Sequence, residues 1–259
     1  MKVAIIKHML DEKLKQITAK KQRLDTAKPL PEELIKNLDE WFKIELAYTS
    51  NAIEGNTLSR QETALIIEKG ITVEGKTIEE HLEAKNHAEA LDFIKNLVDK
   101  NRRDISENAI LDIHRLILQR IDDKNAGKYR NVAVRIAGST AITPNPLKVP
   151  ELMTEFVEWL QSDNTDHPVK IAADAHFKLV SIHPFIDGNG RTARLLMNLL
   201  LMQEGYPAAI IRKEDRKEYL NALERGQTKN ELENYYTIIY AAVERSLDIY
   251  LEALEQSKK

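Results

Sequence analysis

The feature that most constrains the fold is an apolar run at residues 195–202, which is interrupted only by Asn198. A helix that is apolar on every side is buried in the core of a protein, so we expect a buried helix here. The segment Gly188-Asn189-Gly190 comes shortly before it, and glycine tolerates the backbone conformations of tight turns. The sequence therefore predicts a turn that leads into the N-terminus of a buried helix.

The rest of the chain has the pattern of a helical protein. Nine glycines and eight prolines are few for 259 residues, and apolar residues recur every three or four positions, as on one face of a helix. We expect helices at residues 8–26, 32–52, 59–69, 78–100, 106–121, 150–162, 168–183, 191–204, 215–225 and 231–256. Residues 132–136 partly alternate like a strand, and Gly138-Ser139 separates them from residues 141–144, which predicts one short β-hairpin.

Composition restricts the class of protein and its surroundings. The chain is 42% hydrophobic, enough for the core of one large domain with a short N-terminal extension. A net charge of −3 lacks the basic excess of nucleic-acid-binding proteins, and the absence of cysteine suits a reducing compartment. No apolar run is long enough for a signal sequence or a membrane span. We expect a cytoplasmic protein that binds neither nucleic acid nor membrane, with residues 11–28 as a loosely packed, charge-rich arm.

Residues 183–194 combine the groups that phosphate chemistry requires. A glycine-rich turn at a helix N-terminus directs free backbone N–H groups at an anion, and the helix dipole adds to the attraction. Arg191 and Arg194 lie three positions apart, so both guanidinium groups project from one face of the helix. A Gly-Asn-Gly turn alone is more often an ordinary loop, but the combination in this order favours a polyphosphate site.

Two further side chains of this segment suit catalysis on a bound polyphosphate. Asp187 supplies the hard oxygen ligand that Mg²⁺ prefers alongside waters and substrate phosphates. His183 can take a proton from an attacking hydroxyl group, because its unperturbed pKa lies near neutrality. The sequence thus predicts a metal ligand and a general base on one short segment.

Residues 183–194 match the signature of the Fic family, His-Pro-Phe-x-Asp/Glu-Gly-Asn-Gly-Arg-x-x-Arg, at every specified position. Residues 167–182 and 127–150 also resemble the helix and the flap of that family. The resemblance implies transfer of AMP from ATP to a hydroxyl group of a protein. It assigns His183 as the base and Asp187 as the Mg²⁺ ligand, and it places the phosphates among Gly188, Asn189, Gly190, Arg191 and Arg194. Related Doc kinases have lysine at the position of Gly190, which favours nucleotidyl transfer over phosphoryl transfer here.

Residues 50–56 resemble the inhibitory motif of Fic proteins, Ser/Thr-x-x-x-Glu-Gly/Asn. Ser50 and Glu54 lie one turn apart on a helix face, and Gly55 is a natural helix end. Without the signature downstream, the simpler interpretation is a helix end with an exposed glutamate. In the subclass that carries this motif before the core, the glutamate pairs with the second signature arginine, here Arg194, and blocks the γ-phosphate of ATP.

The resemblance also points to residues around the target protein and the nucleoside. The flap of the family aligns a target segment by strand addition, which would place Ile136, Ile142 and Thr143 beside the target. Tyr219 would line the base pocket. Gln227 stands near the position where many relatives have asparagine, so UTP, GTP or a CDP-linked donor remain alternatives to ATP.

The remaining histidines of the helical segments receive no predicted role in the chemistry. His176 lies upstream of the signature on the same expected helix and belongs in the core or behind the site. His81, His87 and His114 have no second ligand at the spacing of a metal site. Residues 80–96 are a candidate homodimer surface by analogy with relatives.

Together these patterns predict an all-α protein with a Fic-type helical core and a short β-hairpin flap. The expected parts are an N-terminal helical extension (1–49), an inhibitory motif (50–56) and a catalytic core with C-terminal helices (57–259). The expected function is an autoinhibited protein adenylyltransferase, which transfers AMP from Mg-ATP to a Tyr, Ser or Thr hydroxyl group of an unidentified protein, or of itself, and releases pyrophosphate. Two alternatives stay open: a deAMPylase in which Glu54 orients a water, and a nucleotide-sensing module without turnover.

Overall fold

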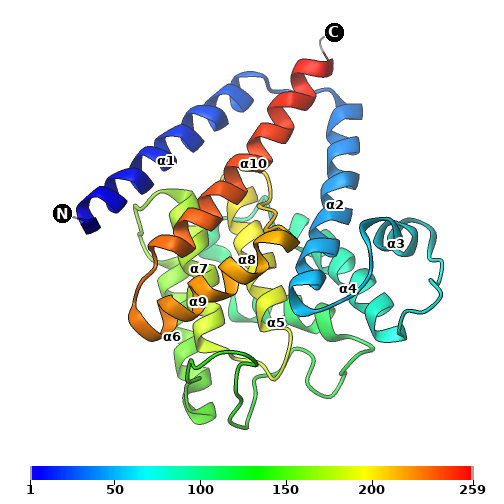
Figure 1. Ribbon diagram of the computed structural model, residues 1–259, viewed down its shortest axis with the longest axis vertical. Helices are drawn as coiled ribbons and strands as arrows, with labels where there is room; N and C mark the ends of the chain where they lie inside the picture. The colour runs from blue at the N-terminus through cyan, green and yellow to red at the C-terminus, as the bar shows by residue number, and fades with distance from the viewer. Residues whose placement is uncertain (1, 258–259) are drawn as a thin grey trace.

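The computed structural model describes residues 2–257, which form a bundle of α-helices without a β-sheet (Figure 1). The helices are α1 (Lys2–Thr26), α2 (Glu32–Glu54), α3 (Arg60–Ala64), α4 (Ile78–Lys95), α5 (Glu107–Leu118), α6 (Val149–Gln161), α7 (Pro168–Ile182), α8 (Asn189–Gln203), α9 (Arg216–Lys229) and α10 (Glu233–Ser257). The predicted all-α fold is confirmed. Within the same residues, none of the helices has the length and apolar character of a bilayer-crossing segment.

Helix α8 lies in the middle of the molecule and packs against α7, α5, α4 and α2 (Figure 1). Every residue from Asn189 to Leu201 is buried except Gly190, which agrees with the buried helix expected from the apolar run. Asn198 interrupts that run because both ends of its amide bond the backbone of Ala209, at 2.8 and 3.3 Å. A buried amide with both groups bonded avoids the cost of desolvated, unpaired polar atoms.

Several helix ends differ from the expected positions. The segment expected as one helix at residues 59–69 is divided into α3 and a π-helical turn, Leu65–Lys69. Helix α3 starts at a capping box in which Ser59 and Glu62 bond each other's backbone N–H groups. Helix α2 ends where Gly55 adopts φ 110°, a left-handed conformation that glycine takes without strain.

The prediction of a loosely packed arm at residues 11–28 is wrong. Residues 11–26 belong to α1, which lies along α10 (Figure 1), and the side chains of Ile17 and Leu24 are buried in the main core. Lys20 bonds Glu244 at 3.1 Å and Asp248 at 2.7 Å. A few apolar side chains therefore suffice to dock α1, because its basic flank meets carboxylates on α10.

The flap retains only a trace of the expected hairpin. Arg135 and Ile142 form a single antiparallel bridge, and Thr143 donates a hydrogen bond from Oγ1 to the carbonyl of Val134 at 2.8 Å. Ile142 is 81% exposed, so no apolar burial supports a longer ladder on its side. The flap is consequently a loop with one bridge and not a regular two-stranded hairpin.

Three histidines are buried among the helices and kept uncharged. Burial lowers the pKa of His87 and His176 to about 3 and that of His114 to about 4. The ring nitrogens of His176 lie 2.7 Å from the hydroxyl of Tyr219 and 2.9 Å from that of Tyr235. This agrees with the expectation that His176 belongs to the core behind the site.

Shortening a central side chain of α8 should destabilise the whole bundle. Leu199 is fully buried, and we expect Leu199→Ala to lower the free energy of unfolding by about 2–5 kcal/mol, because a cavity adds to the lost transfer energy. Leu147→Ala is the matched control, since Leu147 is 87% exposed and should change stability by roughly 0.5 kcal/mol or less. Urea unfolding of the three proteins measures both values, and equal effects would contradict the central place of α8.

The buried histidines should make the protein less stable in mild acid. The folded-state pKa of His114 lies below its ordinary value of 6.5, so the unfolded chain binds the proton first and stability falls as the pH drops from 6.5 towards 4. Removing this group in His114→Gln should reduce the stability lost between pH 7.5 and 5 by about 2 kcal/mol, because each pKa unit corresponds to about 1.4 kcal/mol. Urea unfolding at both pH values tests this, and an unchanged difference would contradict it.

Candidate active site

A cavity of about 370 Å³ lies where the end of α2, the signature turn, the flap and α9 meet. A cavity of this size is in the range of small-molecule and cofactor sites. Among the residues named from the sequence, those that line it are Glu54, Ile136, His183, Asn189, Gly190, Arg194, Tyr219 and Gln227. The structure thus brings the inhibitory motif, the signature and the expected nucleoside residues to one place.

His183 ends α7 in a left-handed conformation, with φ 51°. Its N–H group bonds the carbonyl of Leu179 at 3.0 Å, and its carbonyl accepts a hydrogen bond from Nε of Arg130 at 2.7 Å. Such a backbone conformation is uncommon for a residue with a side chain and persists where its surroundings hold it. Burial lowers the pKa of the imidazole, an effect that the backbone of Val180 opposes in part, so the ring is neutral at pH 7 and can accept a proton.

Arg130 is a positioning residue that was not identified from the sequence. Its guanidinium group is buried and bonds three backbone carbonyls: those of His183 at 2.7 Å, Val132 at 3.0 Å and Pro144 at 2.7 Å. The last two carbonyls lie at the two ends of the flap. Arg130 therefore fixes the flap relative to the predicted base. The one signal for this role in the sequence is an arginine just before the flap.

The signature turn is held from inside by its own asparagine. Oδ1 of Asn189 accepts from the N–H group of Phe185 at 2.9 Å, and Nδ2 donates to the Phe185 carbonyl at 3.0 Å. Gly188 precedes α8 with φ 74°, so the first N–H groups of the helix point out of its end without intrahelical partners. The side chain of Asn189 therefore shapes the turn, and the backbone N–H groups remain those predicted to bind an anion.

His114 supports the same turn from α5, although no role was assigned to it from the sequence. Its Nδ1 accepts from the N–H group of Gly127 at 2.9 Å, so Nε2 carries the proton and donates to the carbonyl of Asp187 at 3.0 Å. Its ring stacks on Phe185, with 3.6 Å between centroids and 5° between planes. Its low pKa keeps this arrangement, because protonation of Nδ1 would break the bond to Gly127.

Glu54 and Arg194 form an ion pair at the wall of the cavity. Oε1 of Glu54 lies 2.7 Å from Arg194, whose Nε and terminal nitrogen also bond the hydroxyl and carbonyl of Ser50 at 2.9 and 3.0 Å. Burial opposes the charge of Arg194, but the Glu54 carboxylate and the Tyr219 hydroxyl together outweigh this effect and raise the pKa of the guanidinium group. A Cβ atom on Gly190 would overlap the Glu54 carboxylate, so this carboxylate lies against the turn predicted to hold phosphate.

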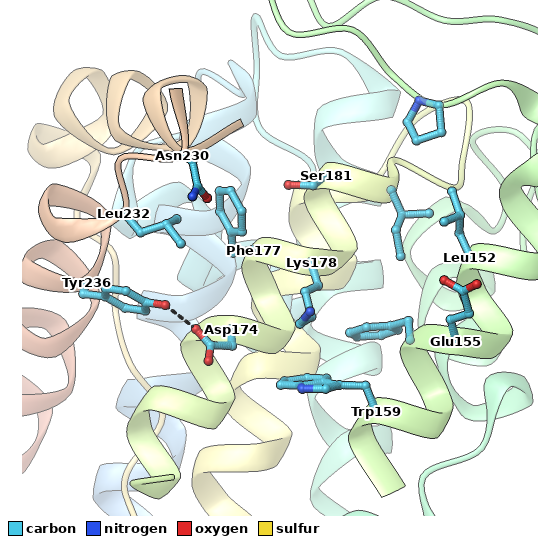
Figure 2. Close-up of a pocket in the computed structure, with 13 residues that line it drawn as sticks. Leu152, Glu155, Trp159, Asp174, Phe177, Lys178, Ser181, Asn230, Leu232 and Tyr236 are labelled. Atoms are coloured by element: carbon cyan, nitrogen blue, oxygen red, sulfur yellow. Dashed lines mark hydrogen bonds between the residues drawn. The ribbon is translucent and has the colours of Figure 1, made fainter. Parts of the chain in front are cut away.

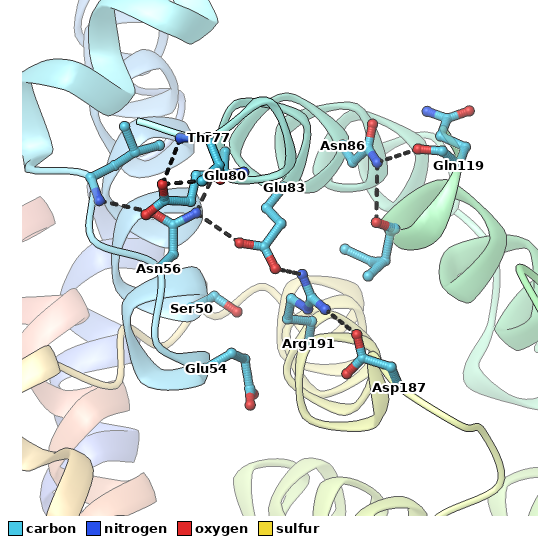
Figure 3. Close-up of polar contacts among 12 residues, drawn as sticks. Ser50, Glu54, Asn56, Thr77, Glu80, Glu83, Asn86, Gln119, Asp187 and Arg191 are labelled. Atoms are coloured by element: carbon cyan, nitrogen blue, oxygen red, sulfur yellow. Dashed lines mark hydrogen bonds and ion pairs between the residues drawn. The ribbon is translucent and has the colours of Figure 1, made fainter. Parts of the chain in front are cut away.

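Arg191 points the other way, toward α4 (Figure 3). Its guanidinium group is buried and bonds Glu83 at 2.6 Å and Asp187 at 3.0 Å. It does not line the cavity, and its predicted contact with phosphate stays a prediction. Nothing in the sequence connected Glu83 with the site, because Glu83 lies far upstream of the signature, on α4.

Asp187 is the residue that could hold Mg²⁺. Its side chain is 65% exposed on the signature turn, and Arg191 bonds its Oδ2 atom. Residues 2–257 contain no cluster of three or more histidine, cysteine, aspartate or glutamate side chains with the arrangement of a metal site. A single accessible carboxylate fits Mg²⁺, which takes its other ligands from waters and substrate phosphates.

Tyr219 and Gln227 line the cavity from α9. Burial raises the pKa of Tyr219 to about 12, and Nε2 of Gln227 lies 3.4 Å from the carbonyl of Val180. From the flap, Ile136 reaches the cavity, whereas Ile142 and Thr143 do not line it. Of the three flap positions, Ile136 therefore lies in the cavity, and the contacts of Ile142 and Thr143 with a target stay predictions.

A larger cavity of about 680 Å³ lies apart from these residues, between α6, α7 and the start of α10 (Figure 2). Trp159, Phe177 and Lys178 form part of its wall, and Asp174 accepts a hydrogen bond from Tyr236 at 2.6 Å. It contains none of the residues predicted for catalysis or nucleotide binding. The smaller cavity beside the signature is therefore the candidate active site.

Comparisons with known proteins agree with this geometry. The Fic/DOC family matches residues 104–201. The structure of Fic-1 from C. elegans is 32% identical with a TM-score of 0.89 and covers 98% of this chain and 76% of its own. A Fic domain containing signaling protein from Bacteroides thetaiotaomicron is 31% identical with a TM-score of 0.83, over 94% of this chain and 98% of its own.

Curated relatives with Fic in their names match this chain at higher sequence identity. A protein from Culex quinquefasciatus named "Protein adenylyltransferase Fic" is 38% identical over 256 residues, which is 98% of this chain and 50% of the relative. The chain therefore spans about half the length of the curated relatives it matches. The signature, the helical fold and these similarities together show that the chain belongs to the Fic/DOC family.

Proposed function

We propose that the protein is an autoinhibited protein adenylyltransferase, which transfers AMP from Mg-ATP to a hydroxyl group of a protein. The observation that carries this proposal is the position of the Glu54 carboxylate, bonded to Arg194 and lying against Gly190 in a cavity that also contains His183. A carboxylate in the place of a phosphate group implies a site for anions that is closed from within. The names of the relatives support adenylyl transfer as the reaction.

In this proposal, residues of the chain carry out each chemical step. The neutral imidazole of His183 accepts the proton of the target hydroxyl, whose oxygen attacks the α-phosphorus; the bond to the pyrophosphate oxygen breaks and pyrophosphate leaves. N–H groups at the start of α8 and the charge of Arg194 bind the phosphate oxygens. Asp187 would hold Mg²⁺, which offsets phosphate charge when bound.

The target segment is proposed to lie along the flap. The N–H groups of Ser139, Thr140 and Ala141 already have partners within the protein. An extended segment of another protein would pair with other backbone groups of this loop by strand addition. Arg130 keeps both flap ends close to the backbone of His183. A hydroxyl group on that segment would thereby reach the base. The same geometry admits self-modification by a second copy of the chain.

Glu54 is proposed to hold the site in a low-activity state. Its bond to Arg194 occupies the cation that an incoming phosphate group needs. A charge-assisted hydrogen bond contributes about 1.5–3 kcal/mol, and each ~1.4 kcal/mol changes an equilibrium tenfold. Release of this contact should therefore raise activity about 10- to 100-fold.

Removal of AMP from a modified protein is the second candidate. Glu54 bonds Arg194 through Oε1, while its side chain remains 37% exposed toward the cavity. A carboxylate in that position can orient and deprotonate a water that attacks the phosphorus of an AMP-modified side chain. In this reaction Glu54 is required, whereas in AMP transfer it inhibits.

Replacing the inhibitory carboxylate separates these functions. We expect Glu54→Gly to raise transfer of label from [α-³²P]ATP to protein about 10- to 100-fold, and the added change His183→Ala to abolish it. The measurement is protein-bound label with Mg²⁺ present, in parallel with ATP labelled at the γ-phosphate. The wild-type protein is the reference for the low-activity state.

Three other results would indicate a function other than AMP transfer. Label from the γ-phosphate would indicate a kinase. Release of AMP from a modified protein by the wild type, lost in Glu54→Gly, would favour deAMPylation. Binding of ATP without transfer in any variant would favour a nucleotide-sensing module and contradict the enzyme.

A further inference from the structure

The buried guanidinium group of Arg191 lies between two carboxylates from distant parts of the chain (Figure 3). Glu83 on α4 accepts its bond at 2.6 Å, and Asp187 on the signature turn accepts another at 3.0 Å. The side chains of Arg191 and Glu83 are only 3% and 14% exposed, whereas that of Asp187 is 65% exposed. One carboxylate thus belongs to the interior of the protein and the other to the open site.

Glu83 also contacts the segment that follows the inhibitory helix. Its second oxygen accepts a hydrogen bond from Nδ2 of Asn56 at 2.8 Å, and the same amide bonds the carbonyl of Glu80 at 3.2 Å. Oδ1 of Asn56 accepts from the N–H group of Leu58 at 2.9 Å, which fixes the orientation of the amide. A continuous chain of bonds therefore runs from Asn56 through Glu83 and Arg191 to Asp187.

The charged groups in this series of bonds differ in how easily they can change partners. Arginine stays protonated at all relevant pH values, and a buried charge is costly without a partner. If Asp187 turns toward a cation, Arg191 loses one of its two carboxylates. Among the described residues Glu83 is then the remaining carboxylate bonded to that guanidinium group.

We propose that Glu83 is a positioning residue for the metal-nucleotide complex. By neutralising Arg191, it leaves the exposed carboxylate of Asp187 free to bind Mg²⁺ with the nucleotide phosphates. Because Glu83 also bonds Asn56, the availability of Asp187 for Mg²⁺ depends on the position of the segment that carries Glu54. The proposal rests on the proposed function, because it concerns the metal ligand of the same site.

The test measures nucleotide binding without turnover. The reference protein carries Glu54→Gly and His183→Ala, and calorimetry gives its affinity for ATP with EDTA and at increasing Mg²⁺ concentrations. Adding Glu83→Gln keeps the size of the side chain but removes its charge, so Arg191 should hold Asp187 more tightly. We expect the Mg²⁺ concentration for half-maximal enhancement of ATP binding to rise about tenfold, as for loss of one charge-assisted bond, with the affinity in EDTA unchanged.

Two variants distinguish positioning from mere support of the fold. Glu79→Gln is the matched control, since Glu79 is exposed on the same helix and should leave the Mg²⁺ requirement as in the reference. Glu83→Gln/Arg191→Gln removes both buried charges and with them the competitor for Asp187. We expect its Mg²⁺ requirement to return close to that of the reference, and it keeps the question testable if Glu83→Gln alone does not fold.

The link to the inhibitory segment has its own variant. Asn56→Ala removes the bond to the Glu83 carboxylate but keeps its charge beside Arg191, so we expect a smaller rise in the Mg²⁺ requirement, of about two- to threefold. No rise would overturn that link. An unchanged requirement in folded Glu83→Gln, or no return in the double variant, would overturn the role of Glu83. If Mg²⁺ does not change ATP binding in the reference protein, the role of Asp187 as a metal ligand in the proposed function would be wrong.

Discussion

The burial of two arginines in α8 is the constraint on which the rest of the structure depends. Arg191 and Arg194 lie inside the bundle, and charges so placed need partners from other elements. Helix α4 supplies Glu83, and α2 supplies Ser50 and Glu54. The central helix therefore selects its neighbours by charge as well as by apolar fit. The same pairings determine which side of α8 is occupied and which side opens into the cavity.

The sequence was sufficient for the helical class, the buried helix and the place of the signature. These features are local: they follow from the apolar period, from the glycines of the turn and from residues close together in the chain. It was also sufficient to suggest that Glu54 and Arg194 meet, but only through the family resemblance. Periodicity alone carries no information on which helix faces which.

The features that were missed or mistaken depend on contacts between distant residues. Helix α1 looked loosely packed because the acidic partners of its lysines lie on α10. Arg130 and His114 act on backbone groups far along the chain, those of His183 and Asp187. A side chain that bonds a backbone group needs no complementary side chain elsewhere in the sequence. No sequence pattern therefore indicated the roles of Arg130 and His114.

Gly190 joins two properties of the site that are usually considered separately. Its missing side chain would let the backbone approach a phosphate, and it also provides the space that the Glu54 carboxylate fills. A side chain at this position would overlap the Glu54 carboxylate, which would have to move aside. Within this fold, a substitution at position 190 would therefore act on the predicted phosphate turn and on the contact between Glu54 and Arg194 at the same time, so its effects on the two cannot be separated.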